Sequence, residues 1–85
     1  MTITLRFFAS VREAVGCAQE ELALPAGVDT VGALREHLCA RGGAWAEALS
    51  GQRALRMACD QIMCHPATVL ADGCEVAFFP PVTGG

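Results

Sequence analysis

Residues 74–85 read Cys74-Glu75-Val76-Ala77-Phe78-Phe79-Pro80-Pro81-Val82-Thr83-Gly84-Gly85. The first half of this stretch alternates in the manner of a strand. Val76 and Phe78 share one face, while Glu75, Ala77 and Phe79 share the other. Two prolines follow, and because proline has no N–H to donate to a sheet, they end the strand. The stretch therefore predicts a strand over 74–79 and an extended segment after it.

The side chains of segment 80–85 become smaller toward its end. Pro80 and Pro81 favour extended backbone, and they are followed by Val82, Thr83, Gly84 and Gly85. A segment of this length spans about 20 Å when fully stretched. It can therefore enter a narrow channel on another protein. We predict a folded domain over 1–79 and a C-terminal tail over 80–85.

The carboxyl group of Gly85 is the candidate reactive group. A C-terminal carboxyl has a pKa of about 3.3–3.7, so it is an anion at neutral pH and a poor electrophile. Activation by transfer of AMP from ATP would let it accept sulfur from a persulfide and become a thiocarboxylate. Glycine suits this role because it leaves the carbonyl unhindered and adopts any backbone conformation that a partner imposes. No catalytic side chain on the domain is needed.

The start of the chain also alternates. Over Thr2–Ala9, one face carries apolar side chains and the other carries polar ones together with Phe8. The motif Ser10-Val11-Arg12-Glu13 predicts a capping box, followed by a short helical turn that ends at Gly16. Phe8 and Phe79 are thus both expected on a face shared with charged residues.

The middle of the chain holds one main helix between strands. A strand is predicted over Gln19–Leu24. The main helix, capped by Asp29 or Thr30, has Val31, Leu34 and Leu38 on one face and ends at Gly42-Gly43. Trp45 and Leu49 predict a further turn packed on the core. Strands over 55–59 and 62–64 form a hairpin around Asp60-Gln61, and Ala71-Asp72-Gly73 is a turn.

This order of elements predicts an α+β fold. The only long crossover is the main helix, which allows the first and last strands to run parallel. The economical packing is one mixed sheet with that helix across one face, which is a β-grasp (ubiquitin-like) arrangement with the first and last strands adjacent at the centre.

Composition excludes several classes of protein. The 85 residues suffice for one domain, and the net charge of −3 disfavours nucleic-acid binding. No apolar run is long enough for a membrane span, and the start lacks a signal-peptide pattern, so we expect a cytoplasmic protein. The five cysteines are odd in number and form no CxxC pair, so they are interpreted as apolar packing residues, and no metal site is predicted. His65 is interpreted as a solvated loop residue.

The C-terminal stretch, from Asp72-Gly73 to Gly84-Gly85, resembles the C-terminal motif of the small-subunit family of molybdopterin synthase (MoaD). The stretch Leu5-Arg6-Phe7-Phe8-Ala9-x-Val11-Arg12-Glu13 resembles that family's first strand and turn. The resemblance covers essentially the whole chain and is weakest over about residues 40–70. Two positions depart from the family pattern: Cys74 stands where the family often has an acidic residue, and Asp60 stands where Asn is common.

The resemblance implies a ubiquitin-like sulfur carrier. Gly85 would be adenylated by an activating enzyme (MoeB-like) that uses ATP and would then become a thiocarboxylate. The tail would enter the large subunit (MoaE-like), which holds the active site, and its sulfur would form the molybdopterin dithiolene on cyclic pyranopterin monophosphate. The assembly would be a heterotetramer in which this chain is a non-catalytic subunit that binds no cofactor.

The family's partner interface maps onto Phe8, Met63 and Phe79, and Arg12 matches a position near the activating-enzyme contact. The aromatic side chains could instead cover the sheet against the chain's own loops. Other functions also stay open: a sulfur carrier for thiamine or tRNA thiolation, a ubiquitin-like protein modifier, or a passive binding module.

Overall fold

The computed structural model describes residues 1–81, so Val82, Thr83, Gly84 and Gly85 of the predicted tail lie outside the described residues. Its elements follow in the order β1 (Thr2–Phe7), α1 (Ala9–Val15), β2 (Gln19–Ala23), α2 (Val31–Cys39), α3 (Gly43–Ala48), β3 (Arg56–Cys59), β4 (Ile62–Cys64) and β5 (Glu75–Phe79). The predicted strand and helix order is confirmed, with boundaries that shift by one to three residues at some ends.

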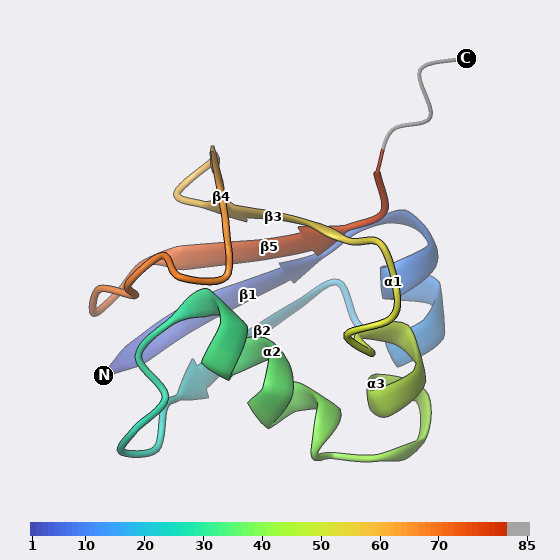
Figure 1. The fold of residues 1–85 in the computed structure, drawn as a ribbon, viewed down its shortest axis with the longest axis horizontal. Coiled ribbons are helices and arrows are strands. Elements are labelled where there is room, and N and C mark those ends of the chain that lie inside the picture. Colours follow the sequence, from blue (N-terminus) through green and yellow to red (C-terminus); the bar gives the residue numbers. More distant parts are fainter. Residues whose placement is uncertain (82–85) are drawn as a thin grey trace.

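The strands form one mixed sheet in the order β2-β1-β5-β3-β4. β1 and β5 lie side by side and parallel, with Leu5 opposite Val76 and Phe7 opposite Phe78. The other pairs, β1 with β2, β3 with β5 and β3 with β4, are antiparallel. α2 and α3 cover one face of the sheet, while α1 lies at its end (Figure 1). The β-grasp arrangement with a central parallel pair is therefore confirmed.

Alternation along the two central strands builds the core. Ile3, Leu5 and Phe7 of β1 are at most 1% exposed, and Val76 and Phe78 of β5 are fully buried. The helical layer adds the fully buried side chains Val31, Leu34, Leu38 and Leu49. The Phe7 ring packs edge-on against the half-buried Trp45, with ring centroids 5.4 Å apart, as expected for a tryptophan packed on the core. This burial holds both central strands, and hence the point where the tail leaves the sheet, against the helices.

The predicted capping box at the start of α1 is wrong. The helix begins at Ala9, its N-cap residue is Phe8, and no side chain of the described residues caps it. The Phe8 N–H donates to the Phe78 carbonyl at 3.3 Å, which keeps residue 8 extended beside β5. Its own carbonyl accepts from Val11 and Arg12, so the helix starts before Ser10 could cap it. The predicted end at Gly16 is confirmed, with φ at 78°.

The main helix also ends earlier than predicted. α2 stops at Cys39, and the following turn is tightened by hydrogen bonds from Arg41 to Leu38 and from Gly42 to Cys39. Gly42, with φ at 77°, becomes the N-cap residue of α3. At the hairpin, Asp60 and Gln61 have φ of 51° and 68°, the left-handed geometry of a two-residue turn.

The N-terminus of α2 is fixed in two ways. Thr30 Oγ1 accepts a hydrogen bond from the Ala33 N–H at 3.1 Å, as predicted for a cap. The segment before β5 covers the same helix end, with Val31 N–H donating to the Thr68 carbonyl and Gly32 N–H to the Pro66 carbonyl at 2.9 Å. A Cβ atom at position 32 would lie 3.1 Å from both Cβ and the carbonyl oxygen of Pro66.

We therefore expect Gly32→Ala to destabilise the fold by about 1–2 kcal/mol, because the crowded backbone carbonyl must move. The matched control is Gly51→Ala, where a Cβ would meet no atom of the described residues within 4 Å. Urea unfolding of the two variants measures the difference. Equal midpoints would show that the contact at Pro66 relaxes without cost.

An ion pair ties β2 to the turn after α2. The Arg41 guanidinium donates to both Glu20 carboxylate oxygens, at 3.0 and 2.6 Å. It also lies 4.4 Å from the centre of the Trp45 ring. The hydrogen bonds from Arg41 lower the pKa of Glu20, against an opposing effect of partial burial. The pair therefore fastens an edge strand to the helical layer.

We expect Glu20→Gln to cost about 0.5–1 kcal/mol at neutral pH. Because the pKa of Glu20 is lowered by folding, the ionised pair contributes stability above the ordinary glutamate pKa, and this contribution is lost as the pH falls through the lowered value. Wild type and variant should therefore converge in acid. Urea titrations at neutral pH and near pH 3 test this, with Glu21→Gln, an exposed neighbour on β2, as the control. A difference that persisted in acid would contradict the assignment.

Candidate functional site

The sheet face away from α2 and α3, called here the open face, carries the second set of alternating side chains. In β1 these are Thr2, Thr4 and Arg6, and the extended residue Phe8 continues the series. In β5 they are Glu75, Ala77 and Phe79. The alternation predicted from the sequence is therefore confirmed on both central strands. Within residues 1–81, no helix packs across the open face (Figure 1).

An aromatic pair marks the end of the open face from which the chain leaves the sheet. The rings of Phe8 and Phe79 lie edge to face, with centroids 6.4 Å apart and planes at 84°. Phe8 is 41% exposed, although it is a large apolar side chain, and Phe79 is half-buried. Neither ring is covered by the described loops to the degree that a core position would require. The two predicted interface residues thus form one contact pair at the surface.

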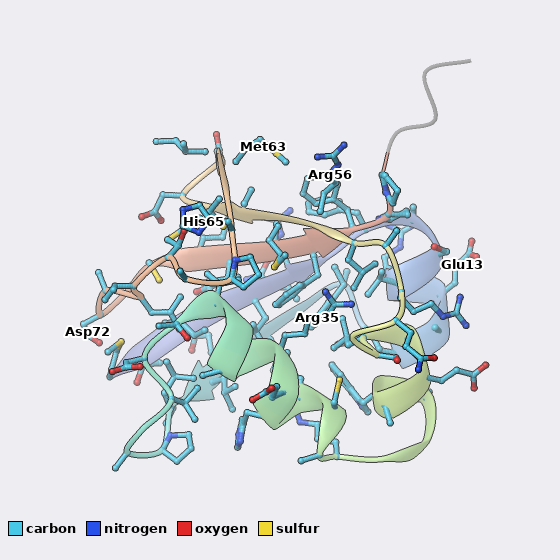
Figure 2. All side chains as sticks on the ribbon, in the orientation of Figure 1. Glu13, Arg35, Arg56, Met63, His65 and Asp72 are labelled. Atoms are coloured by element: carbon cyan, nitrogen blue, oxygen red, sulfur yellow. The ribbon has the colours of Figure 1, made fainter. Side chains whose placement is uncertain are left out.

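Two alanines on the open face lie in the cross-strand row next to the aromatic pair, between Arg6 and Met63. Across the sheet, Arg6 lies opposite Ala77, Ala77 opposite Ala58, and Ala58 opposite Met63. Adjacent strands are about 4.8 Å apart, so Met63 lies about 10 Å from β5. Met63 is 57% exposed, and Figure 2 places it on the same side of the sheet as Arg56. Because alanine side chains are short, a partner can approach the strands closely between the larger residues.

Of the arginines on or beside the open face, Arg6 is paired with a glutamate, whereas Arg56 and Arg12 are exposed. Arg6 lies 3.5 Å from Glu75, and its guanidinium carbon lies 5.5 Å from the centre of the Phe8 ring. Arg56 lies opposite Phe79 in the β3–β5 register and is exposed. Arg12 is exposed on α1, whose first turn is bound to Phe8 through the backbone. The structure thus places Arg12 on the helix that adjoins the aromatic end.

The described part of the tail continues directly from this end. β5 stops at Phe79, and Pro80 and Pro81 follow, both half-buried. The predicted tail-binding residues Val82, Thr83 and Gly84, and the predicted reactive residue Gly85, lie outside the described residues. The open face and the root of the tail therefore form one continuous surface.

The thiols are packed away from this surface. Cys74 is 3% exposed, and the other four pack against the core cluster, which confirms their interpretation as packing residues. Burial, reinforced by the neighbouring Cys74, raises the pKa of Cys59 to about 11. Burial also raises the pKa of Cys17 and Cys64. These three thiols therefore stay protonated at neutral pH and are poor nucleophiles.

The helical side of the molecule has a concavity of about 400 Å³, lined in part by Arg35, Cys39 and Leu49. Arg35 donates from there to the carbonyls of Leu49, at 2.7 Å, and of Ser50 and Arg53. These bonds fix the segment that leads into β3, so the arginine has a structural role. Among residues 1–81, no group of three or more His, Cys, Asp or Glu side chains could hold a metal ion. No helix in that same range is long and apolar enough to cross a bilayer.

The family model that matches this chain is described as the ThiS family, and the match covers residues 5–85. The chain belongs to the ThiS family. Its sequence is 48% identical over 83 residues to the molybdopterin synthase sulfur carrier subunit of Escherichia coli (strain K12), covering 98% of this chain and 99% of that relative. The ThiS-family chain and that relative therefore correspond over nearly their full lengths.

Solved structures of other proteins superpose on this chain over its full length. The crystal structure of the small archaeal modifier protein 1 from Haloferax volcanii superposes with a TM-score of 0.76 at 22% identity, covering 100% of both chains. A complex of subunits 1 and 2 of molybdopterin-converting factor from Helicobacter pylori 26695 contains a chain that superposes with a TM-score of 0.68 at 22% identity, again covering 100% of both. The ThiS-family chain therefore has the ubiquitin-like β-grasp fold.

Sequence reasoning placed Ala77 on the open face but missed its neighbours Arg56 and Ala58 on β3. The signal was present, since Arg56 and Ala58 alternate with Met57 and Cys59 along β3. The register of β3 against β5, which decides what they lie beside, comes only from the structure.

Proposed function

We propose that this chain is the sulfur carrier subunit of a molybdopterin synthase. The observation that carries the proposal is the 48% identity with the E. coli sulfur carrier subunit across 98% of the chain. The open face with its aromatic end and adjoining tail root supports it, because it joins an exposed apolar surface to the segment that would be delivered. The body of the domain serves as a recognition unit for the tail.

The chemistry takes place at Gly85 in three steps. A carboxylate oxygen attacks the α-phosphate of ATP, pyrophosphate leaves, and a glycyl adenylate forms. The terminal sulfur of a persulfide then attacks the carbonyl carbon and AMP leaves. Reductive cleavage of the S–S bond by a thiol releases the terminal thiocarboxylate. The raised pKa of the half-buried Cys59 and Cys64 thiols makes these two side chains poor competitors for the activated carbonyl.

Two protein partners follow from this chemistry. An ATP-dependent activating enzyme of the MoeB-like class must hold the tail during adenylation. A large subunit of the MoaE-like class must receive the charged tail, supply the active site and place the sulfur on cyclic pyranopterin monophosphate. The complex of subunits 1 and 2 from H. pylori is a precedent for such a pairing on the same fold. This chain is the sulfur-donating, non-catalytic subunit, and ATP is consumed by the activating enzyme.

Intact mass spectrometry tests the proposal. The chain is incubated with ATP, an activating enzyme and a persulfide donor, and its mass should rise by the difference between sulfur and oxygen. Addition of the large subunit and cyclic pyranopterin monophosphate should return the mass to its starting value while molybdopterin forms. Covalent adducts with other proteins would instead indicate a modifier. Sulfur loading without molybdopterin formation would indicate a carrier for another product, and an unchanged mass would indicate a passive binding module.

A further inference from the structure

Arg56 occupies a special position on the open face. It lies opposite Phe79, the last residue of β5 before the tail, so its side chain borders the aromatic end. The side chain is exposed (Figure 2). Among residues 1–81 it has no ion pair within 4 Å, whereas Arg6, Arg41 and Arg53 each lie beside a glutamate.

Within the described residues, Arg56 has no free acidic group on the same part of the face. Glu75 is the acidic residue of β5, but it lies four residues before Phe79 and is paired with Arg6 at 3.5 Å. The neighbours of Arg56 across and along the sheet are Phe79 and Ala58, whose side chains accept no hydrogen bond. In the free chain, water solvates the guanidinium.

A partner that covers Phe79 removes that water. Strands are about 4.8 Å apart, so a protein surface seated on the Phe79 ring also covers the adjacent guanidinium. A desolvated cation is costly unless it is paired and hydrogen-bonded. A carboxylate is the acceptor whose two oxygens match the guanidinium fork.

We infer that Arg56 pairs with a carboxylate on the protein that covers Phe79, so the partner surface around the root of the tail is acidic. The inference rests on the proposed function, in which that protein is the large synthase subunit. The pair has two effects. It admits partners with a carboxylate at this place and rejects those without one, and it steers association at low ionic strength.

Isothermal titration calorimetry with the full chain and the large subunit tests the inference. Arg56→Gln, which keeps hydrogen-bond donors but loses the charge, should weaken binding by about 30-fold or more at low salt. Arg56→Lys should recover part of the affinity. The matched control is Arg53→Gln, because Arg53 is exposed and its ion pair with Glu47 is long, at 3.8 Å; it should change affinity by no more than about 2-fold. Raising the salt concentration should narrow the gap between wild type and Arg56→Gln.

Two results would overturn the inference. One is an Arg56→Gln chain that binds as tightly as wild type. The other is a loss of affinity that is the same at low and high salt, which would indicate packing by the arginine stem. Phe79→Arg separates these results from a failure of the proposed function. If Phe79→Arg weakens binding and Arg56→Gln does not, only the ion pair is wrong. If neither variant changes binding, the interface of the proposed function is wrong as well.

Discussion

Deletion of Gly85 is expected to abolish molybdopterin formation and to leave the thermal midpoint of the chain nearly unchanged. Loss of one residue shortens the extended tail by about 3.4 Å. A reacting group misplaced by even 1 Å can lose about 100-fold in rate, so the shortened tail cannot present its carbonyl correctly. The fold should not respond, because Phe78 is the last described residue of the buried core along the chain and precedes Gly85 by seven positions.

The measurement combines reconstituted molybdopterin synthesis with a thermal melt. A chain lengthened by one alanine after Gly85 is the matched control for tail length, and it should fail in the same way. Gly51→Ala, which alters an uncrowded glycine in the body, should keep full activity. Intact mass then separates the two steps, because a shortened chain that acquires sulfur but does not deliver it has lost only the fit to the large subunit. Normal synthesis by the shortened chain would refute the role of Gly85.

Much of the fold follows from local patterns in the sequence. The alternation in β1 and β5 assigns Phe7 and Phe78 to the core and Phe8 and Phe79 to the open face, because successive side chains of a strand point to opposite sides. The single helical crossover then allows the first and last strands to be the parallel neighbours that the structure shows. Strand alternation alone is therefore sufficient to identify the two aromatic residues of the open face.

The features that the sequence did not predict depend on contacts between distant residues. The start of α1 is determined by a hydrogen bond between Phe8 and Phe78, which lie seventy positions apart and which no capping motif reveals. The segment after α3 is fixed by Arg35, through carbonyls of residues 49, 50 and 53. The position of Arg56 beside Phe79 follows from the β3–β5 register, which local sequence patterns do not reveal. Local propensity decides where strands and helices form, while tertiary hydrogen bonds and register decide their ends and their neighbours.

The aromatic end of the open face is expected to supply much of the affinity for the large subunit. Phe79→Arg replaces an apolar contact with a long cation next to Arg56, so a covering partner would have to desolvate two neighbouring positive charges. We expect the complex to weaken by at least about 100-fold, in the range of residues that dominate interfaces. The variant also loses the edge-to-face contact with Phe8, which contributes about 0.5–1.5 kcal/mol to stability in such pairs.

Calorimetry with the large subunit measures the affinity, and a urea titration of the free chain measures how much stability is lost. The control is Val69→Arg, which places the same charge at an apolar position that is 71% exposed and lies in the segment between β4 and β5. It should bind nearly as well as wild type, because Val69 is outside the open face. Phe79→Leu, which keeps an apolar side chain, should retain most of the affinity. Binding by Phe79→Arg at the wild-type level, with the fold intact, would exclude the aromatic end as the surface that the partner covers.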